Sequence, residues 1–138
     1  MSNLVRLSLS LEKPLLEKLT DMVNESGYDN RSEYIRDLIR DKLINEQWES
    51  GKEVIATVTV VFNHHQRGLT EKLVELQHHS GEHVLAATHL HLSHEICSEM
   101  IMIKGNGDNI KKLANSIRQL RGVLNVNFSM STTGEHIS

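Results

Sequence analysis

The residues best able to do chemistry are crowded into one short stretch of this chain. Eight of its nine histidines lie within residues 64–94, and the single cysteine, Cys97, follows three residues later. In the segment 88–92 (THLHL), polar and apolar residues alternate. Because alternate side chains of a β-strand share a face, His89 and His91 are expected to point the same way. If the chain then turns and Cys97 returns on a neighbouring strand, two imidazoles and a thiolate converge, which is three-quarters of a four-coordinate transition-metal site.

A strand histidine taken alone is more often a tolerated polar residue than a ligand. Two histidines on one face, leucines at the alternating positions and a returning cysteine together favour metal binding. Five other histidines of the stretch are left without a role, because solvent-exposed histidines are common. They are His64, His65, His79, His83 and His94.

Composition narrows the class of protein. The 138 residues suit one domain of ordinary size or two small ones, and a net charge of −3 with 24% charged residues indicates neither disorder nor a basic tail. A lone cysteine cannot form an intrachain disulfide, which favours a reducing compartment. No apolar run approaches the ~20 residues that span a bilayer, and the N-terminus lacks the apolar stretch of a signal peptide. We expect a cytoplasmic protein with no membrane contact.

The first third of the chain predicts a strand followed by two helices. Apolar and polar residues alternate from Val5 to Ser10, which is typical of a strand. Pro14 suits a first helical turn, and apolar residues then recur at helical spacing until Gly27. Asn30 and Glu33 fit the N-cap and third position of a second helix.

One strand and two short helices cannot bury a sufficient core, and a solitary strand leaves its backbone groups unpaired. Both problems are solved if two chains pair these strands antiparallel, so the segment predicts an intertwined dimer. The resulting two-stranded ribbon presents Arg6, Ser8 and Ser10 of each chain on one polar face, and such a ribbon fits the DNA major groove. The alternative is that these residues are simply the hydrated face of an exposed strand.

Residues 3–46 resemble the ribbon-helix-helix repressors, especially in the turn Gly27-Tyr28-Asp29-Asn30-Arg31-Ser32-Glu33. The resemblance implies that Asn30, Arg31 and Ser32 hold a DNA phosphate at the start of the second helix. Residues 1–46 carry seven Lys and Arg against nine Asp and Glu, so the segment is no general polyanion binder. Tight binding would therefore need specific contacts to an operator.

The second half predicts a different architecture. After a DNA-binding domain over 1–47 and a short polar hinge over 48–53, strands and helices over 54–133 follow the order βαββαβ. That order is the ferredoxin-like split motif, a four-stranded antiparallel sheet with both helices on one face, which ACT domains share. The fold class predicted for the whole chain is therefore α+β.

This architecture gives an expectation about the histidines. If Leu90 and Leu92 face the core under the helices, His89 and His91 face the open side of the sheet. His78, at the end of the first helix of this half, would then complete the metal site only from another subunit.

The whole pattern resembles the nickel-responsive transcriptional regulators of the NikR type, over about residues 4–131. The motif that carries the resemblance is Leu76-Gln77-His78, then His89-Leu90-His91, then Cys97. The resemblance implies a square-planar site for Ni²⁺, one per subunit, with His89, His91 and Cys97 of one chain and His78 of another. It also implies a homotetramer built as a dimer of dimers, which binds the palindromic half-sites of a double-stranded DNA operator and represses nickel uptake genes.

Two further sites are implied by the same resemblance. A hard-cation site between the domains of the family corresponds to Glu33 and Asp37, which lie four residues apart on one helix; solvated carboxylates are the alternative. A Lys-Arg pair that touches DNA backbone in some relatives corresponds here to Gln66 and Arg67, so only Arg67 keeps that contact.

Other functions were weighed against this one. A regulator of another transition metal (copper, cobalt or zinc) uses the same donors, and the usual affinity order places copper highest. A zinc metalloenzyme would need a general base, and no candidate accompanies the histidines. An antitoxin-like or amino-acid-sensing regulator needs no metal, which leaves the cysteine in register with the histidines unexplained.

Overall fold

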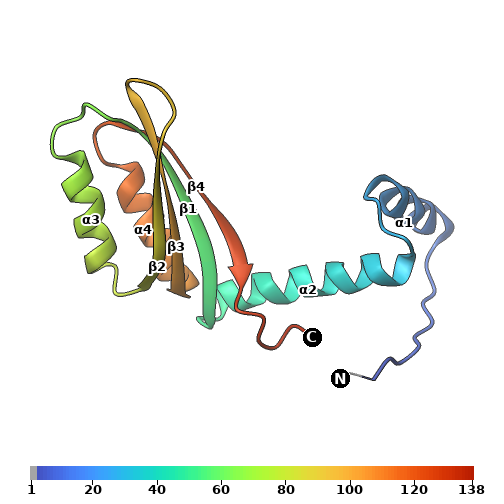
Figure 1. Ribbon diagram of the computed structural model, residues 1–138. Coiled ribbons are helices and arrows are strands. Elements are labelled where there is room, and N and C mark those ends of the chain that lie inside the picture. The colour runs from blue at the N-terminus through green and yellow to red at the C-terminus, as the bar shows by residue number, and fades with distance from the viewer. Residues whose placement is uncertain (1–2) are drawn as a thin grey trace. The chain divides into compact units, whose positions relative to one another are not determined.

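The computed structural model describes residues 3–138 and consists of two compact units (Figure 1). The first contains residues up to Leu43, together with His136–Ser138, and the second is Ile44–Glu135. Among the described residues no helix is both long and apolar enough to cross a bilayer.

The first unit is built on helices α1 (Lys13–Glu25) and α2 (Arg31–Glu49), as the apolar spacing predicts. Pro14 lies in the first turn of α1, where a missing backbone N–H costs nothing. The Oδ1 atom of Asn30 accepts a hydrogen bond of 2.9 Å from the backbone N–H of Glu33. Asn30 therefore caps α2, as its position in the sequence predicts.

The strand expected over residues 5–10 is not formed in the single chain, where residues 3–12 have no regular structure. Val5 and Leu7 are 87% and 80% exposed, and Val23 is the only buried apolar side chain among the described residues of this unit. The physical reason is the one that predicts a dimer: a lone strand has no neighbour for its backbone N–H and C=O groups.

The second unit is a four-stranded antiparallel sheet with the strand order β2-β3-β1-β4. The predicted order βαββαβ is confirmed by β1 (Glu53–Asn63), α3 (Leu69–His79), β2 (His83–His91), β3 (Ile96–Asn106), α4 (Gly107–Arg118) and β4 (Val123–Thr132). Strand β3 runs to Asn106, and α4 begins at the next residue, Gly107.

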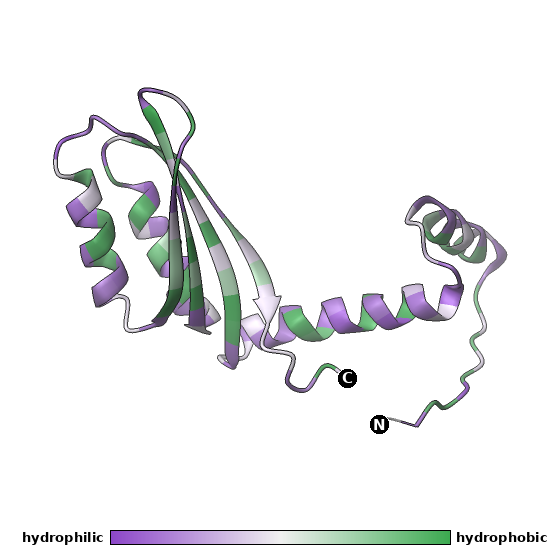
Figure 2. Cartoon of the chain, in the orientation of Figure 1, coloured by the Kyte–Doolittle hydropathy of each residue, from purple (hydrophilic) through white to green (hydrophobic). Residues whose placement is uncertain are grey.

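Helices α3 and α4 cover one face of this sheet (Figure 1). Along β1 every second residue is buried. The strand is coloured mostly as hydrophobic in Figure 2. The core contains the buried residues of β1, β3 and the two helices: Val54, Ala56, Val58, Val60, Phe62, Leu69, Leu73, Cys97, Ile101, Ile103, Ile110, Leu113, Ala114 and Ile117. Cys97 is thus part of the core as well as a candidate ligand.

The segment expected to be a hinge over 48–53 begins inside this core. Helix α2 continues to Glu49, and Trp48 at its end is 1% exposed. The Trp48 indole N–H donates to the Ser131 carbonyl at 2.9 Å, and its ring stacks on Phe128 at 5.8 Å between centroids. A Cβ on Gly107 would lie 2.8 Å from Trp48, so only glycine permits this packing. The second unit consequently starts at Ile44.

We predict that Trp48→Ala lowers the free energy of unfolding of the second unit by about 3–5 kcal/mol, because it leaves a cavity and an unpaired Ser131 carbonyl. The loss is measured by urea unfolding followed by far-UV circular dichroism, since the chain has no other tryptophan to report. Leu124→Ala, at a position 62% exposed, is the control. Equal stability of the two variants would contradict the packing role of Trp48.

Candidate metal centre

Strand pairing places three of the predicted ligands together. In the antiparallel pair of β2 and β3, His91 lies opposite Cys97 and His89 lies opposite Glu99. Directly opposed residues project to the same side of a sheet, so both imidazoles and the thiol share one face. The Sγ atom of Cys97 lies 3.2 Å from Nδ1 of His91, and the rings of His89 and His91 are 5.1 Å apart.

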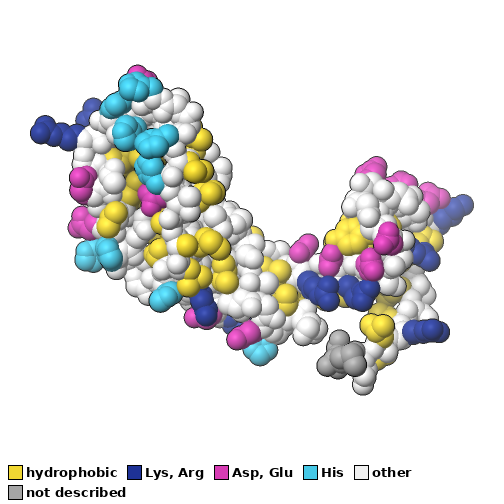
Figure 3. Space-filling view, viewed as in Figure 1, with side chains coloured by type: hydrophobic (Ala, Val, Ile, Leu, Met, Phe, Trp, Pro, Cys, Tyr) yellow, Lys and Arg dark blue, Asp and Glu magenta, His cyan; other side chains and the backbone are white. Residues whose placement is uncertain are grey.

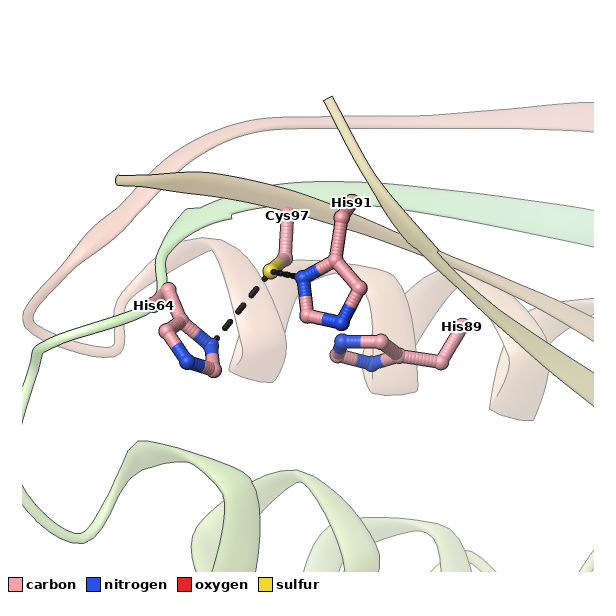
Figure 4. Close-up of side chains that lie close together, drawn as sticks. All are labelled: His64, His89, His91 and Cys97. Atoms are coloured by element: carbon pink, nitrogen blue, oxygen red, sulfur yellow. Dashed lines mark hydrogen bonds between the residues drawn. The ribbon is translucent and has the colours of Figure 1, made fainter. Parts of the chain in front are cut away.

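A fourth donor comes from the same chain, and sequence reasoning left it without a role. His64 follows the end of β1, and its Nδ1 atom lies 3.4 Å from Cys97 Sγ, on the other side of the sulfur from His91 (Figure 4). One ligand atom from each of His64, His89, His91 and Cys97 lies within 4.8 Å of the others. We call these four residues the donor cluster. A usable signal existed in the sequence, since His64 directly follows the strand that pairs with β3.

The expectation about the two faces of the sheet was wrong. Leu90 and Leu92 are 42% and 58% exposed, whereas His89 contacts the core residue Phe62 at 5.9 Å between ring centroids. The histidines therefore lie on the side that the helices cover. The position of β2 at the edge of the sheet explains why these histidines can be exposed on that side. The helices do not fully cover the face of an edge strand, so polar side chains there still reach solvent.

The donor cluster fits a borderline transition metal. Cys97 is fully buried while the three histidines are exposed. The sulfur is therefore the buried donor of the cluster, and the imidazoles are its solvent-accessible donors. Three imidazoles and one thiol suit nickel, copper or zinc rather than calcium or magnesium, which prefer oxygen ligands.

A hydrogen bond ties helix α3 to the strand beneath the cluster. The side-chain amide of Gln77 donates to Glu99 Oε1 at 3.2 Å, and Glu99 lies opposite His89 in the sheet. The neighbouring residue His78 lies on the exposed surface of α3, beside Val74, and is not part of the donor cluster. The structure thus brings together three of the four predicted ligands and leaves His78 apart.

Comparison with known proteins identifies both halves of the chain. Residues 55–131 match the family described as the NikR C-terminal nickel-binding domain, and residues 5–46 match the ribbon-helix-helix proteins of the copG family. Proteins named as nickel-responsive regulators are similar over nearly the full length. One from Pyrococcus furiosus is 40% identical, covering 97% of this chain and 98% of its own. One from Syntrophus aciditrophicus is 37% identical, covering 98% of both chains.

This chain belongs to the nickel-responsive regulators. It is a transcriptional regulator rather than an enzyme, with a ribbon-helix-helix DNA-binding domain and a nickel-binding domain. The fold of the second domain is also found in the ACT domain of a GTP pyrophosphokinase from Chlorobium tepidum. That structure has a TM-score of 0.51 at 19% identity, and the match covers 56% of this chain and all of that domain. The predicted α+β architecture is confirmed.

The residues that this regulator is expected to use on DNA lie at the surface. Arg6, Ser8 and Ser10 are exposed in the irregular segment before α1. Arg31 and Ser32 form the first turn of α2, where free backbone N–H groups favour a phosphate, and both are exposed. In the second domain Arg67 is exposed in the turn between β1 and α3.

The predicted carboxylate pair of the regulator is engaged with cations of its own helix. Asp37 accepts hydrogen bonds from the Tyr28 hydroxyl and, at 3.3 Å, from Arg40, while Glu33 lies 3.9 Å from Arg36. A divalent cation here would have to replace these partners. The hydrogen bond from Tyr28, followed by that from Arg40, lowers the pKa of Asp37, and the same bond raises the pKa of Tyr28.

We predict that Tyr28→Phe raises the pKa of Asp37 towards the ordinary aspartate value, as measured by NMR titration of the side-chain carboxyl carbon. A lowered pKa in the folded state adds stability above the unfolded-state pKa, and this is lost as the pH falls through the folded pKa. The variant should therefore be less stable than the parent at neutral pH, and the difference should disappear as the pH falls through the folded-state pKa of Asp37. Tyr34→Phe, whose hydroxyl faces Met22 instead, is the control. An unchanged Asp37 titration in Tyr28→Phe would contradict the assignment.

Proposed function

We propose that this chain is a nickel-dependent repressor of nickel uptake genes, which binds an operator of two palindromic half-sites as a homotetramer. The observation that carries the proposal is the in-register group of His89, His91 and Cys97 within a NikR-type domain. These three residues are proposed to hold one Ni²⁺ per subunit, with His78 of a neighbouring subunit as the fourth ligand. Bound there, the ion supplies bonds that join residues of two subunits.

The choice of His78 over His64 rests on what a regulator must do. A ligand can shift an equilibrium between two states only if it binds one of them better. A site completed by His64 is finished within one chain, so occupancy would be indifferent to assembly. A site completed by His78 exists only when two subunits are correctly placed, so occupancy favours that arrangement. Within one chain, His64 Nδ1 lies 3.4 Å from Sγ of Cys97.

The exposed apolar surface of the first unit supports the proposal that two chains pair. Its strand residues and helices leave a row of large apolar side chains exposed: Leu4, Val5, Leu7, Leu9, Leu11, Leu15, Leu16, Met22, Leu38 and Ile39. So many exposed apolar side chains beside a single buried Val23 are unfavourable in water. Pairing of two copies through residues 5–10 and the helices would bury them. That arrangement would place Arg6, Ser8 and Ser10 of each copy on a DNA-reading ribbon.

The second unit offers a surface for joining the dimers. Helix α3 exposes Val74 next to His78 along a shallow apolar hollow, and β2 is an unpaired edge of the sheet. We propose that this surface meets the donor cluster of a neighbouring subunit. The two DNA-binding pairs then lie at the ends of a dimer of dimers, and metal occupancy selects the spacing that fits both half-sites.

We predict that Arg6→Ala weakens binding to the operator by about 1–3 kcal/mol for each lost bidentate contact and relaxes base preference at that position. Nickel affinity should be unchanged, since Arg6 is in the other unit. Binding is measured by fluorescence anisotropy at fixed salt, because phosphate contacts make affinity depend on salt. Arg121→Ala, at an exposed position of the second unit, is the control. Parental affinity of Arg6→Ala would exclude the ribbon as the reading element.

We predict that His78→Ala and His89→Ala each abolish the parental thiolate-to-nickel charge-transfer band, and that unfolding and refolding the two variants together restores it in part. Some interfaces of a mixed tetramer then combine an intact His89-His91-Cys97 group with an intact His78. Cys97→Ala mixed with His89→Ala in the same way sets the baseline, because every chain of that mixture lacks one ligand of the His89-His91-Cys97 group.

The same measurement also tests the alternative that His64, rather than His78, is the fourth nickel ligand. If His64 is the fourth ligand, His78→Ala keeps the band by itself and His64→Ala loses it. If His78 is the ligand, His64→Ala keeps the band. Retention of the band by His78→Ala would refute the intersubunit site while leaving nickel binding by the domain in place.

A further inference from the structure

Two exposed histidines outside the donor cluster face each other at its entrance. His65 lies in the turn after β1, His94 lies in the turn between β2 and β3, and their ring centroids are 5.6 Å apart. We call His65 and His94 the entry pair. Figure 3 shows histidine side chains gathered at one end of the second unit. The nickel centre proposed above uses neither residue of the entry pair.

Backbone hydrogen bonds hold the two turns against each other. The N–H of His64 donates to the Glu95 carbonyl at 2.7 Å, which joins the turn of His65 to that of His94. The His65 N–H donates to Asn63 Oδ1 at 2.9 Å, and Ser93 Oγ accepts the Ile96 N–H at 3.1 Å. The separation of the entry pair is therefore fixed by the fold rather than by two freely moving loops.

The entry pair continues the donor cluster without a break. Ring centroids are 5.6 Å apart from His94 to His65, 5.3 Å from His65 to His64 and 5.5 Å from His64 to His91. The ring centroids of His89 and His91, two proposed ligands of the centre, are 5.1 Å apart, so the spacing is nearly uniform. The row starts at exposed rings and ends at the buried thiol of Cys97.

We propose that the entry pair is a loading site, which takes a hydrated divalent transition-metal ion from solvent and passes it through His64 to His91 and Cys97. Two neutral imidazoles and retained water molecules are a weak and quickly exchanging ligand set, as a transfer site requires. Each transfer replaces one imidazole, or one water, by the next ligand without a change of oxidation state. At the last transfer the Cys97 thiol releases its proton to solvent as sulfur binds the ion. The inference rests on the proposed nickel centre.

The test compares the rate and the extent of metal loading in the full-length protein. Metal-free protein is mixed with a substoichiometric amount of NiCl₂ in a stopped-flow instrument, and the thiolate-to-nickel charge-transfer band is followed. The variant is His65→Gln combined with His94→Gln. The control is His83→Gln combined with His136→Gln, which removes two exposed histidines that belong neither to the donor cluster nor to the surface around His78.

If the entry pair is a loading site, nickel should load several-fold more slowly into the variant than into the parent and the control. The final intensity of the band and the equilibrium affinity for nickel should be the same in all three proteins. Because the affinity is unchanged, release of nickel to a chelator should slow by the same factor. A parental loading rate overturns the entry pair alone. A smaller final band also overturns it, since the residues would then belong to the final site. A parent chain without any band overturns the nickel centre and the entry pair together.

Discussion

The register between β2 and β3 is the constraint on which the site depends. It pairs His91 with Cys97 and His89 with Glu99, so the donors share one face and one end of the sheet. A slip of one residue would turn both histidines to the opposite face and bring Leu90 and Leu92 inward. The interior strand β3 is fixed on its other side, where Phe62 lies opposite Cys97. The core residues of β1 thus hold the thiol in place, and the edge strand brings the imidazoles to it.

The two units differ in what they need from other chains. The second has a closed core that includes Trp48, and its donor cluster is assembled within one polypeptide. The proposed ligand His78 would come from a neighbouring subunit. The first buries almost nothing alone, so its proposed DNA-reading strand would form only if a copy of the chain pairs with it. This division suits a regulator, because the part that recognises metal is preorganised while the part that recognises DNA depends on assembly.

Periodicity alone was enough to predict both helices of the first unit, all six elements of the second and the convergence of His89, His91 and Cys97. It could not assign the face, because β2 presents leucines to solvent and histidines inward, against the usual hydrophobic rule. It could not assign His64 either, since nearness to Cys97 arises from pairing of strands distant in sequence. Trp48 was taken for part of a polar hinge because its partners, Ser131 and Phe128, lie far along the chain.

The place of β2 at the sheet edge has a consequence for the lifetime of the protein. An edge strand has one row of unsatisfied backbone groups and separates from its neighbour more easily than an interior strand. An ion shared by His91 on β2 and Cys97 on β3 would act as a clamp across that boundary. It would raise the cost of opening by an amount that grows with free metal concentration. Hydrogen exchange and proteolysis at this edge would then slow as the concentration of free metal rises.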